Sequence, residues 1–600
     1  MKGSSIRYLW PYLRGRYRWL LGCLFYALVG ASASAFSPFV LGHAIDDLQH
    51  GVRLPVLFFY AIGLLSLSAT LGIFRYLLRM LTGDMAATVS YEMSRDFFAR
   101  LLILDQQTRV DYGSGDLLSR ATIDFIYIWR FFSAGFQMML HSLVLVVIGC
   151  ILMASASPLL AIIVFGSLVV TSTLQLRLGR VLEAAFDRVQ REMAHLSAFS
   201  QEHLTTVRMV KAYTQEPQVV STFDAANERY AESNLKFTLR SGLISPIPGT
   251  AVRLTTAIVL AVGGAKVIGG SITVGQFVQF IVYLGLLSNA AVQISSAYER
   301  LQQGAAATGR IAEILLRQPR IADAPDAATP EIQGAVSMHG VSFRSAGRTI
   351  LHDVDFDVPA GSTVGIVGAT GSGKSTLLGL IARVQDPNTG EVLIDGYDVR
   401  TLALKTLRGA MAIVPQETLL FTMSLRDNIT LGLHDVPEEK VLDALTTARL
   451  SNDLPQLPRG LDTPVGERGA TLSGGQKQRT AIARALVRDP RILLLDDALA
   501  SVDAQTASQI IAGLAGRGAG KASRTTFIVS QHLLAVRNAD LILVMENGTI
   551  VERGTHDELV ALGGRYAAMY EREHQRRATE EETVDDLIDQ EEQVWAETRH

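Results

Sequence analysis

The segment Gly368-Ala-Thr-Gly-Ser-Gly373-Lys374-Ser375 decides the fold of the C-terminal part of this chain. It follows the apolar stretch Val364-Gly-Ile-Val367, which predicts a buried strand, and precedes Thr376-Leu-Leu-Gly-Leu, which predicts a helix. A glycine-rich turn between a strand and a helix allows backbone N–H groups to cradle phosphate at the helix N-terminus. The segment therefore predicts a phosphate-binding loop in an α/β domain.

The side chains of this loop and of a later strand predict a site for ATP and Mg²⁺. Lys374 offers a positive charge to the β- and γ-phosphates, and the Ser375 hydroxyl can ligate Mg²⁺. The strand Ile492-Leu-Leu-Leu-Asp496 ends in a carboxylate that can hold the same ion. The residues of the loop expected to contact nucleotide are Gly368, Gly371, Ser372, Gly373, Lys374, Ser375 and Thr376.

The N-terminal half is apolar enough to predict a membrane domain. The chain has 600 residues, of which 48% are hydrophobic, and it is too long for a single core. A helix needs about 20 apolar residues to cross a bilayer. Runs of suitable length are expected at 19–45, 54–78, 132–155, 158–177, 243–267 and 274–297. The predicted fold is therefore an all-α transmembrane domain of six long helices followed by an α/β ATPase domain.

Basic residues predict how the spans are oriented. Arginines cluster at one end of the runs: Arg75, Arg79, Arg130, Arg177, Arg180, Arg240, Arg300 and Arg310. By the positive-inside rule, both termini, both long connections (79–131 and 178–242) and the ATPase domain are expected in the cytosol. The basic N-terminus also resembles a signal peptide, but its apolar run continues past the small residues Ala31-Ser-Ala-Ser-Ala35. The sequence predicts a multi-pass protein of the cytoplasmic membrane.

Charge and cysteine content exclude other classes of protein. The net charge of -3 provides no general basic field, so nucleic acid is not expected as a partner. Cys23 and Cys150 both lie in apolar runs and form no disulfide framework.

The two long connections predict helices that extend beyond the membrane. Apolar residues at helical spacing run through 91–104 and 185–216. The turns are expected at Gly113–Arg120 and Val207–Tyr213, with Gly115, Asp116, Lys211 and Tyr213 as candidate docking residues between the membrane and ATPase domains. A plain solvated helix is the alternative.

Polar residues inside the apolar runs predict either a cavity or contacts between helices. His141 and Arg253 are candidates for a substrate cavity, because ionisable groups in a membrane usually face a cavity or a partner. Hydrogen bonding between helices is the alternative, and it is preferred for the amides Gln137, Gln279, Asn289 and Gln293. Pro246 and Pro248 are expected to kink the fifth span or delay its start.

The expected domain boundaries follow from composition. Residues 1–315 form the membrane domain, 316–334 a proline-containing linker, 335–572 the nucleotide-binding domain and 573–600 a charged tail. In the tail, Val584, Leu587, Ile588, Glu591, Val594 and Trp595 follow helical spacing with one polar break. A short helix and a disordered acidic tail are both compatible with this pattern.

The segment Leu472-Ser473-Gly474-Gly475-Gln476-Lys-Gln-Arg479 resembles the signature of the ATP-binding cassette (ABC) transporter family. The resemblance extends over nearly the whole chain and is to exporter half-transporters. It implies that Ser473 and Gly475 contact ATP held by the opposite subunit, at the start of a helix suited to anions. Gln416 resembles the family's glutamine that senses Mg²⁺. The segment Thr463–Gly469 resembles the exporter X-loop, and Ala500–Asp503 resembles the D-loop.

Three departures from the family pattern predict impaired hydrolysis. Asp497 stands where the resemblance implies a glutamate base, and its shorter side chain misplaces the carboxylate. Gln531 stands at the switch-histidine position, where a neutral amide cannot carry a positive charge. His532 is adjacent, but neighbouring strand residues point to opposite faces. Ser345 stands where an adenine-stacking aromatic is expected, unless Phe343 or a neighbour compensates.

These departures all lie on one side of the expected composite site, and the signature is intact. The resemblance therefore implies a heterodimer with a second half-transporter that has an intact glutamate and switch histidine. The expected function is ATP-driven export of a hydrophobic compound, lipid or peptide, in contact with membrane lipid. An ATP-gated channel or regulatory subunit, and a homodimeric exporter with Asp497 as a slow base, are the alternatives.

Overall fold

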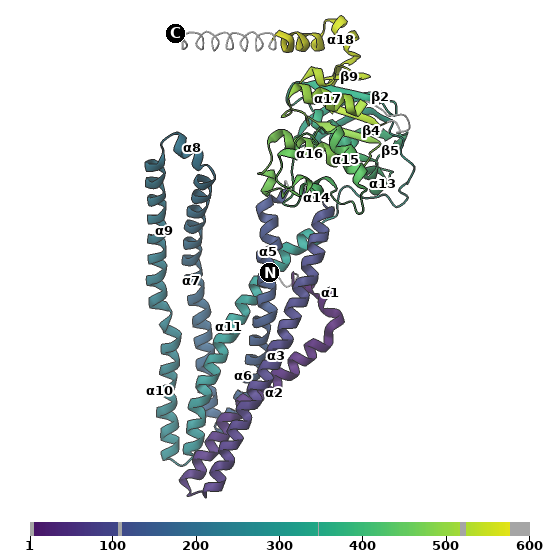
Figure 1. The fold of residues 1–600 in the computed structure, drawn as a ribbon. Coiled ribbons are helices and arrows are strands. Elements are labelled where there is room, and N and C mark those ends of the chain that lie inside the picture. The colour runs from purple at the N-terminus through teal and green to yellow at the C-terminus, as the bar shows by residue number, and fades with distance from the viewer. Residues whose placement is uncertain (1–4, 106–107, 109–110, 346, 516–523, 576–600) are drawn as a thin grey trace. The chain divides into compact units, whose positions relative to one another are not determined.

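The computed structural model describes residues 5–105, 108, 111–345, 347–515 and 524–575. The chain divides into two compact units, the first of residues 1–103 and 109–318 and the second of residues 104–108 and 319–600. The proposed tail helix from Val584 to Trp595 lies outside the described residues. Figure 1 shows both units as ribbons.

The first unit is built of long helices. Within the described residues, six helical stretches are long and apolar enough to cross a membrane. The helices that form them are α2 (Tyr17–Gln49), α3 (Leu54–Ile103), α5 (Ser114–Arg130), α6 (Phe136–Ala156), α7 (Pro158–Thr205), α9 (Glu216–Ile244), α10 (Pro246–Ile268) and α11 (Val274–Leu316). This arrangement confirms the predicted fold class of the N-terminal half.

The predicted extension of the spans into the long connections is also confirmed. α3 and α7 continue well beyond the apolar runs, and α9 leads directly into α10 at Ser245. The break at Ser245 agrees with the expected effect of Pro246, because proline lacks the N–H that a continuing helix needs. The short helix α8 (Val207–Ala212) joins α7 to α9, and these two run side by side in Figure 1.

The apolar core of the first unit lies where α6, α7, α10 and α11 meet. Its largest buried side chains are Tyr283, Phe280 and Leu160. The Tyr283 hydroxyl donates a hydrogen bond to the carbonyl oxygen of Ala35 on α2, at 2.6 Å. A buried hydroxyl needs such a partner, so this contact fixes α11 against α2.

Ion pairs join α5 to α11. The Arg310 guanidinium pairs with Asp124, and its Nε lies 2.9 Å from Asp124 Oδ2. Arg120 donates from Nη1 to Glu313 Oε2 at 2.8 Å and from Nε to Asp116 Oδ2 at 2.9 Å. The two helices are therefore connected by charged groups as well as by apolar packing.

Removing the carboxylate of Asp124 is expected to destabilise the first unit. The Asp124 side chain is 2% exposed and that of Arg310 is 42% exposed, so water partly rehydrates the arginine once its partner is lost. We expect Asp124→Leu to lower the free energy of unfolding by about 1–3 kcal/mol. The measurement is the thermal unfolding midpoint of the full chain in detergent. The control is Arg95→Gln, which breaks the ion pair between Arg95 (64% exposed) and Asp96 (41% exposed) and is expected to cost less than about 0.5 kcal/mol. Equal shifts of the unfolding midpoint in the two variants would contradict the expectation.

The second unit contains two sheets. Its parallel strands are β3 (Thr363–Gly368), β8 (Thr525–Val529), β7 (Ile492–Asp496), β6 (Met411–Val414) and β9 (Leu541–Glu546), with β10 (Thr549–Gly554) antiparallel at the edge. The order across this sheet is β10-β9-β3-β8-β7-β6. The strands β3, β7 and β8 are buried along nearly their whole length, as expected of parallel strands covered on both faces.

A smaller antiparallel sheet packs in the same unit. Its order is β2-β1-β4-β5, formed by β2 (Arg348–Val358), β1 (Val336–Ser345), β4 (Thr389–Ile394) and β5 (Tyr397–Asp398). The segment predicted as a linker contacts this unit: Ala328 pairs with Leu402, and Asp323 accepts a hydrogen bond from the Leu404 N–H at 2.7 Å. The α/β fold predicted for the C-terminal half is confirmed.

Candidate functional site

The carboxyl ends of four neighbouring parallel strands bring the predicted site residues to one edge of the sheet. The phosphate loop follows β3, Gln531 follows β8, Asp496 ends β7 and Gln416 follows β6. The register pairs Asp496 with Val529 and Val414 with Leu495, so these ends are level. In an open parallel sheet this edge is where ligands bind.

The glycines of the loop adopt backbone conformations that other residues avoid. Gly368 has φ +148°, Gly371 +84° and Gly373 +99°. A Cβ on Gly368 would lie 2.2 Å from the carbonyl oxygen of Met545 on β9. Glycine is therefore required here both for the turn and for the close approach of two strands.

Lys374 begins helix α12 (Lys374–Ile381) and folds back over the loop. Its Nζ donates hydrogen bonds to the carbonyl oxygens of Gly368 and Ala369, both at 2.8 Å. Burial lowers the pKa of the ammonium group, and the negative charges of Asp497 and Asp496 oppose this change. The positive charge is thus held at the loop, in reach of the region where phosphates would lie.

Ser375 and Asp496 lie together as the predicted metal ligands. The Ser375 hydroxyl donates to Asp496 Oδ1 at 2.9 Å. Burial raises the pKa of Asp496, the neighbouring charge of Asp497 adds to this, and the hydrogen bond from Ser375 opposes it. A partly buried carboxylate beside a second carboxylate and a hydroxyl is an oxygen donor set that suits Mg²⁺.

Ser372 shows that the loop fits a phosphate. It is 4% exposed, and its Oγ has no hydrogen-bond partner among the described residues. A buried polar atom without a partner is costly and is explained when a ligand satisfies it. Together with the glycine cradle and the Lys374 ammonium, this hydroxyl fits a nucleotide phosphate.

Asp497, at the expected position of the base, is held by two neutral amides. Gln416 Nε2 lies 3.5 Å and Gln531 Nε2 lies 3.4 Å from Asp497 Oδ2. The carboxylate is 7% exposed, and the backbone of Asp497 has φ +50°, a left-handed conformation that aspartate tolerates better than most residues. Neither amide can accept or carry an extra proton at neutral pH.

His532 contacts a different carboxylate from Gln531, the residue at the predicted switch position. Its Nδ1 lies 3.7 Å from Glu573 Oε1, and its ring lies beside that carboxylate while Gln531 contacts Asp497. The neighbouring backbone N–H of Leu533 also donates to Glu573, at 2.8 Å. Gln531 and His532 both lie beyond the end of β8 at Val529, so the predicted strand alternation does not apply, but the two side chains do contact different carboxylates.

Ser345 ends β1 and is half-buried. Phe343 is 8% exposed and packs in the core with Leu351 and Val354. Because its ring is committed to the core, Phe343 does not provide the stacking aromatic that was considered as compensation.

The signature residues form a capped helix start. Ser473 caps α16 (Gly474–Leu486): its Oγ accepts from the Gln476 N–H at 3.3 Å, and Gln476 Oε1 accepts from the Ser473 N–H at 3.0 Å. A Cβ on Gly475 would lie 3.1 Å from the carbonyl oxygen of Ser501. The structure thus forms the compact helix N-terminus that an anion site needs.

Gln478 links this helix to the D-loop. Its Oε1 accepts a hydrogen bond from the Ser501 N–H at 2.8 Å. In the sequence, Gln478 is recognisable only as part of the signature segment. Its signal was its place on the buried face of the amphipathic helix that follows Ser473.

The four candidate docking residues lie at helix ends in the first unit. Gly115 and Asp116 are in the first turn of α5, where Asp116 pairs with Arg120. Lys211 is in α8 and Tyr213 follows it, and both are exposed. Their exposure leaves them accessible for contacts.

The two candidate cavity residues are separated by the fold. His141, on α6, lines a cavity of about 860 Å³ with Gln137 and Gln293. Arg253, on α10, is exposed and does not line this cavity. Gln293 Oε1 also accepts from the Ser142 hydroxyl at 3.5 Å, in agreement with the preferred role of the amides in joining helices.

The same cavity is also lined by residues that the sequence did not indicate as cavity residues. Arg75, Arg79, Arg130 and Arg300 line it, although they were interpreted only as markers of orientation. The spacing of Arg75 and Arg79 was a signal, since residues four apart share a helix face.

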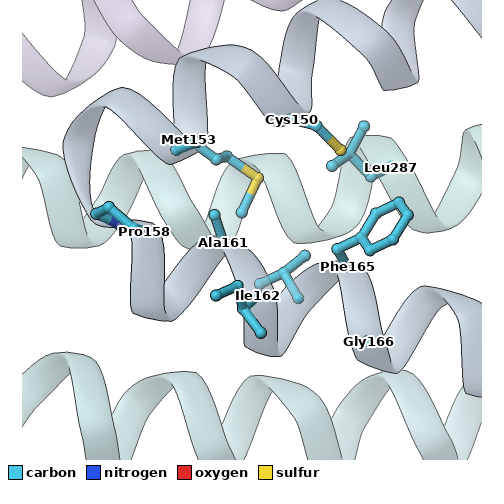
Figure 2. Close-up of a pocket in the computed structure, with 10 residues that line it drawn as sticks. Cys150, Met153, Pro158, Ala161, Ile162, Phe165, Gly166 and Leu287 are labelled. Carbon is cyan, nitrogen blue, oxygen red and sulfur yellow. The ribbon is translucent and has the colours of Figure 1, made fainter.

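A second cavity, of about 370 Å³, lies where α6, α7 and α11 meet. Figure 2 shows Met153, Phe165 and Leu287 on its walls. Apart from the Cys150 thiol, the described side chains that line it carry no polar group, so they offer nothing to orient a polar ligand.

The fold and site define a multi-pass membrane protein with a nucleotide-binding domain. The family described as "ABC transporter transmembrane region" matches residues 20–291, and the family described as "ABC transporter" matches residues 351–500. The chain belongs to the ABC transporter family, as an exporter half-transporter with one membrane domain and one nucleotide-binding domain. Membership implies ATP binding, typically with Mg²⁺, and transport coupled to ATPase activity.

Relatives agree over nearly the whole length. The chain is 33% identical over 545 residues to the "Probable multidrug resistance ABC transporter ATP-binding/permease protein YheI" of Bacillus subtilis, covering 90% of this chain and 92% of that one. It is 31% identical over 592 residues to the "ATP-dependent lipid A-core flippase" of Chromohalobacter salexigens, covering 95% and 98%. The solved "Structure of a bacterial Atm1-family ABC exporter with ATP bound" superposes with a TM-score of 0.80 at 27% identity, covering 94% and 98%.

Proposed function

We propose that this chain is the subunit with the degenerate site in a heterodimeric ABC exporter of the cytoplasmic membrane. One observation carries the proposal: Asp497 is a short carboxylate held by the amides of Gln416 and Gln531, where proton transfer needs a longer and better placed base. The signature helix at Ser473 has no comparable defect. A chain that lacks a competent base but keeps its signature is suited to a partner that has an intact base and uses this signature to complete its own ATP site.

In this proposal the two sides of the chain have different tasks. Ser372, Lys374 and the loop glycines bind and orient phosphates, while Ser375, Asp496 and Gln416 hold Mg²⁺. When bound, ATP with Mg²⁺ supplies the phosphoanhydride bond whose cleavage drives the cycle. Ser473 and Gly475 complete the site of the second half-transporter, where a glutamate and a switch histidine perform hydrolysis.

The membrane half is proposed to move a hydrophobic or amphipathic compound out of the cell. The proposed domains are residues 1–315 for the membrane, 316–334 for the linker, 335–572 for nucleotide binding and 573–600 for the tail. Both termini and the nucleotide-binding domain lie in the cytosol in this arrangement. The turns with Gly115, Asp116, Lys211 and Tyr213 are proposed to transmit motion between the domains. Export is favoured over a channel because the named relatives include a multidrug resistance transporter and a lipid flippase.

Restoring the two altered residues tests the proposal. In a complex whose partner lacks its own catalytic carboxylate, we expect Asp497→Glu with Gln531→His to raise ATP hydrolysis by about 10-fold or more. The longer carboxylate reaches further, and the imidazole adds a group that can carry a proton. The measurement is phosphate release by the purified complex.

The partner is identified in the same preparation. Copurification of the chain from native membranes is expected to yield a second half-transporter with Glu and His at the corresponding positions. Rapid hydrolysis by the unmodified chain alone, with no second polypeptide, would instead establish a homodimeric exporter. Ion conductance in planar bilayers without ATP-dependent uptake in inverted vesicles would establish a channel.

A further inference from the structure

Four arginines from three helices line the large cavity of the first unit. Arg75 and Arg79 lie on α3, Arg130 is the last residue of α5, and Arg300 lies on α11. Among the described residues no Asp or Glu lines this cavity of about 860 Å³. The described part of the wall therefore carries several positive charges and no carboxylate.

One face of α3 is given over to this cavity. Gly72, Arg75, Tyr76, Arg79 and Gly83 all line it, at spacings that place them on one side of a helix. A Cβ on Gly72 or Gly83 would meet no atom within 4 Å, so these glycines border open space. The arginine side chains thus face an open volume.

The four guanidinium groups have no partner inside the described part of the chain. None of them forms a hydrogen bond or ion pair there. By contrast, Arg16, Arg120 and Arg310 in the same unit each pair with a carboxylate. Unpaired like charges in a membrane protein are costly and usually face a substrate or ion.

Orientation by the positive-inside rule does not explain this arrangement. Arg177 on α7 and Arg240 on α9 also follow the predicted orientation, yet they do not line the cavity. An arginine that only marks the inner side has no need to converge with others from distant parts of the chain. The π-helical turn Phe131–Gly135 contributes Ser133 and Ala134 to the wall, and such turns are frequent at functional sites.

We propose that this cavity binds an amphiphile with a phosphate headgroup as the exported substrate, an inference that rests on the proposed export function. A phosphate monoester has three acceptor oxygens and close to two negative charges, which matches several guanidinium groups better than one carboxylate does. Gln137, His141 and Gln293 add hydrogen-bonding groups. Tyr76, Trp129 and Met138 offer apolar surface to the rest of the molecule.

Equilibrium binding of radiolabelled dodecyl phosphate to the full chain, purified with its partner in the neutral detergent dodecyl maltoside, tests the inference. We expect saturable binding, at least about 10-fold tighter than for inorganic phosphate or dodecanol, because charge and apolar surface both contribute. Arg79→Gln with Arg300→Gln is expected to weaken binding by about 10-fold or more. The matched pair Arg177→Gln with Arg240→Gln is expected to leave it unchanged.

The contrary outcomes are distinct. Equal loss in both pairs, or dodecanol binding as tightly as dodecyl phosphate, would overturn the inference. If inorganic phosphate bound as tightly as dodecyl phosphate, the cavity would bind the free anion, and the proposal of an amphiphilic substrate would be overturned. Arg79→Lys with Arg300→Lys, together with the unfolding midpoint, separates lost charge from lost folding, since retained charge should retain part of the binding. Because the assay needs no ATP, absent binding with intact ATP-dependent export would leave the proposed function standing.

Discussion

Ser473→Arg is expected to reduce the ATPase activity of the complex by about 100-fold or more, although Ser473 is distant in sequence from the phosphate loop. In the proposed heterodimer this residue contacts the ATP held by the partner. The substitution places a long cation at the capped start of α16, where the hydroxyl and backbone N–H groups are arranged for an anion. Phosphate release by the purified complex is the measurement.

The matched control for Ser473→Arg is Asp497→Asn. The Asp497 carboxylate already lies between two amides and is expected to contribute little to hydrolysis, so its loss should change the activity of the complex by less than about 2-fold. Equal loss from the two substitutions would contradict the division of tasks between the subunits. A large loss from Asp497→Asn alone would point to a homodimer that uses Asp497 as its base.

Gly368→Ala is expected to abolish nucleotide binding at this chain's own loop. The new Cβ would lie 2.2 Å from the Met545 carbonyl oxygen, and the backbone there has φ +148°. An alanine in this conformation costs about 1–3 kcal/mol in strain, and the clash separates β3 from β9 unless the loop moves. We expect at least about a 10-fold drop in ATP affinity, since the phosphate cradle depends on that backbone.

Photolabelling with 8-azido-ATP measures this loss, because a gel separates the chain from its partner. Gly379→Ala is the matched control. Gly379 lies inside α12, and a Cβ there meets no atom within 4 Å. Alanine in a helix interior is expected to stabilise the domain by about 0.5–1 kcal/mol and to leave labelling intact. Unchanged labelling of Gly368→Ala would refute the role assigned to the glycine cradle.

Several features of the fold could be predicted because their causes are local. The phosphate loop needs a strand, a glycine turn and a helix, and all three lie within 363–381. The six spans follow from hydrophobic length, and the break at Ser245 follows from the ring of Pro246.

Other features depended on which distant segments pack together. The sequence placed His141 and Arg253 in one possible cavity, yet α6 contributes His141 to the large cavity while α10 leaves Arg253 exposed. Periodicity does not state which helix faces which neighbour, because any apolar face can pack against any other. For the same reason the sequence could not tell whether Phe343 stacks on adenine, and its burial in the core excludes this role.

The sequence by itself determined the class of this protein. Each deciding feature is recognisable within a short stretch of the chain: the loop at Gly368–Ser375, the signature at Ser473 and each of the six apolar runs. Only the tertiary structure decided that Gln416 and Gln531 meet at Asp497, and that four arginines spread between residues 75 and 300 line one cavity. Local backbone geometry fixes the first kind of feature. The second kind arises from packing between elements far apart in the chain, which no local pattern specifies.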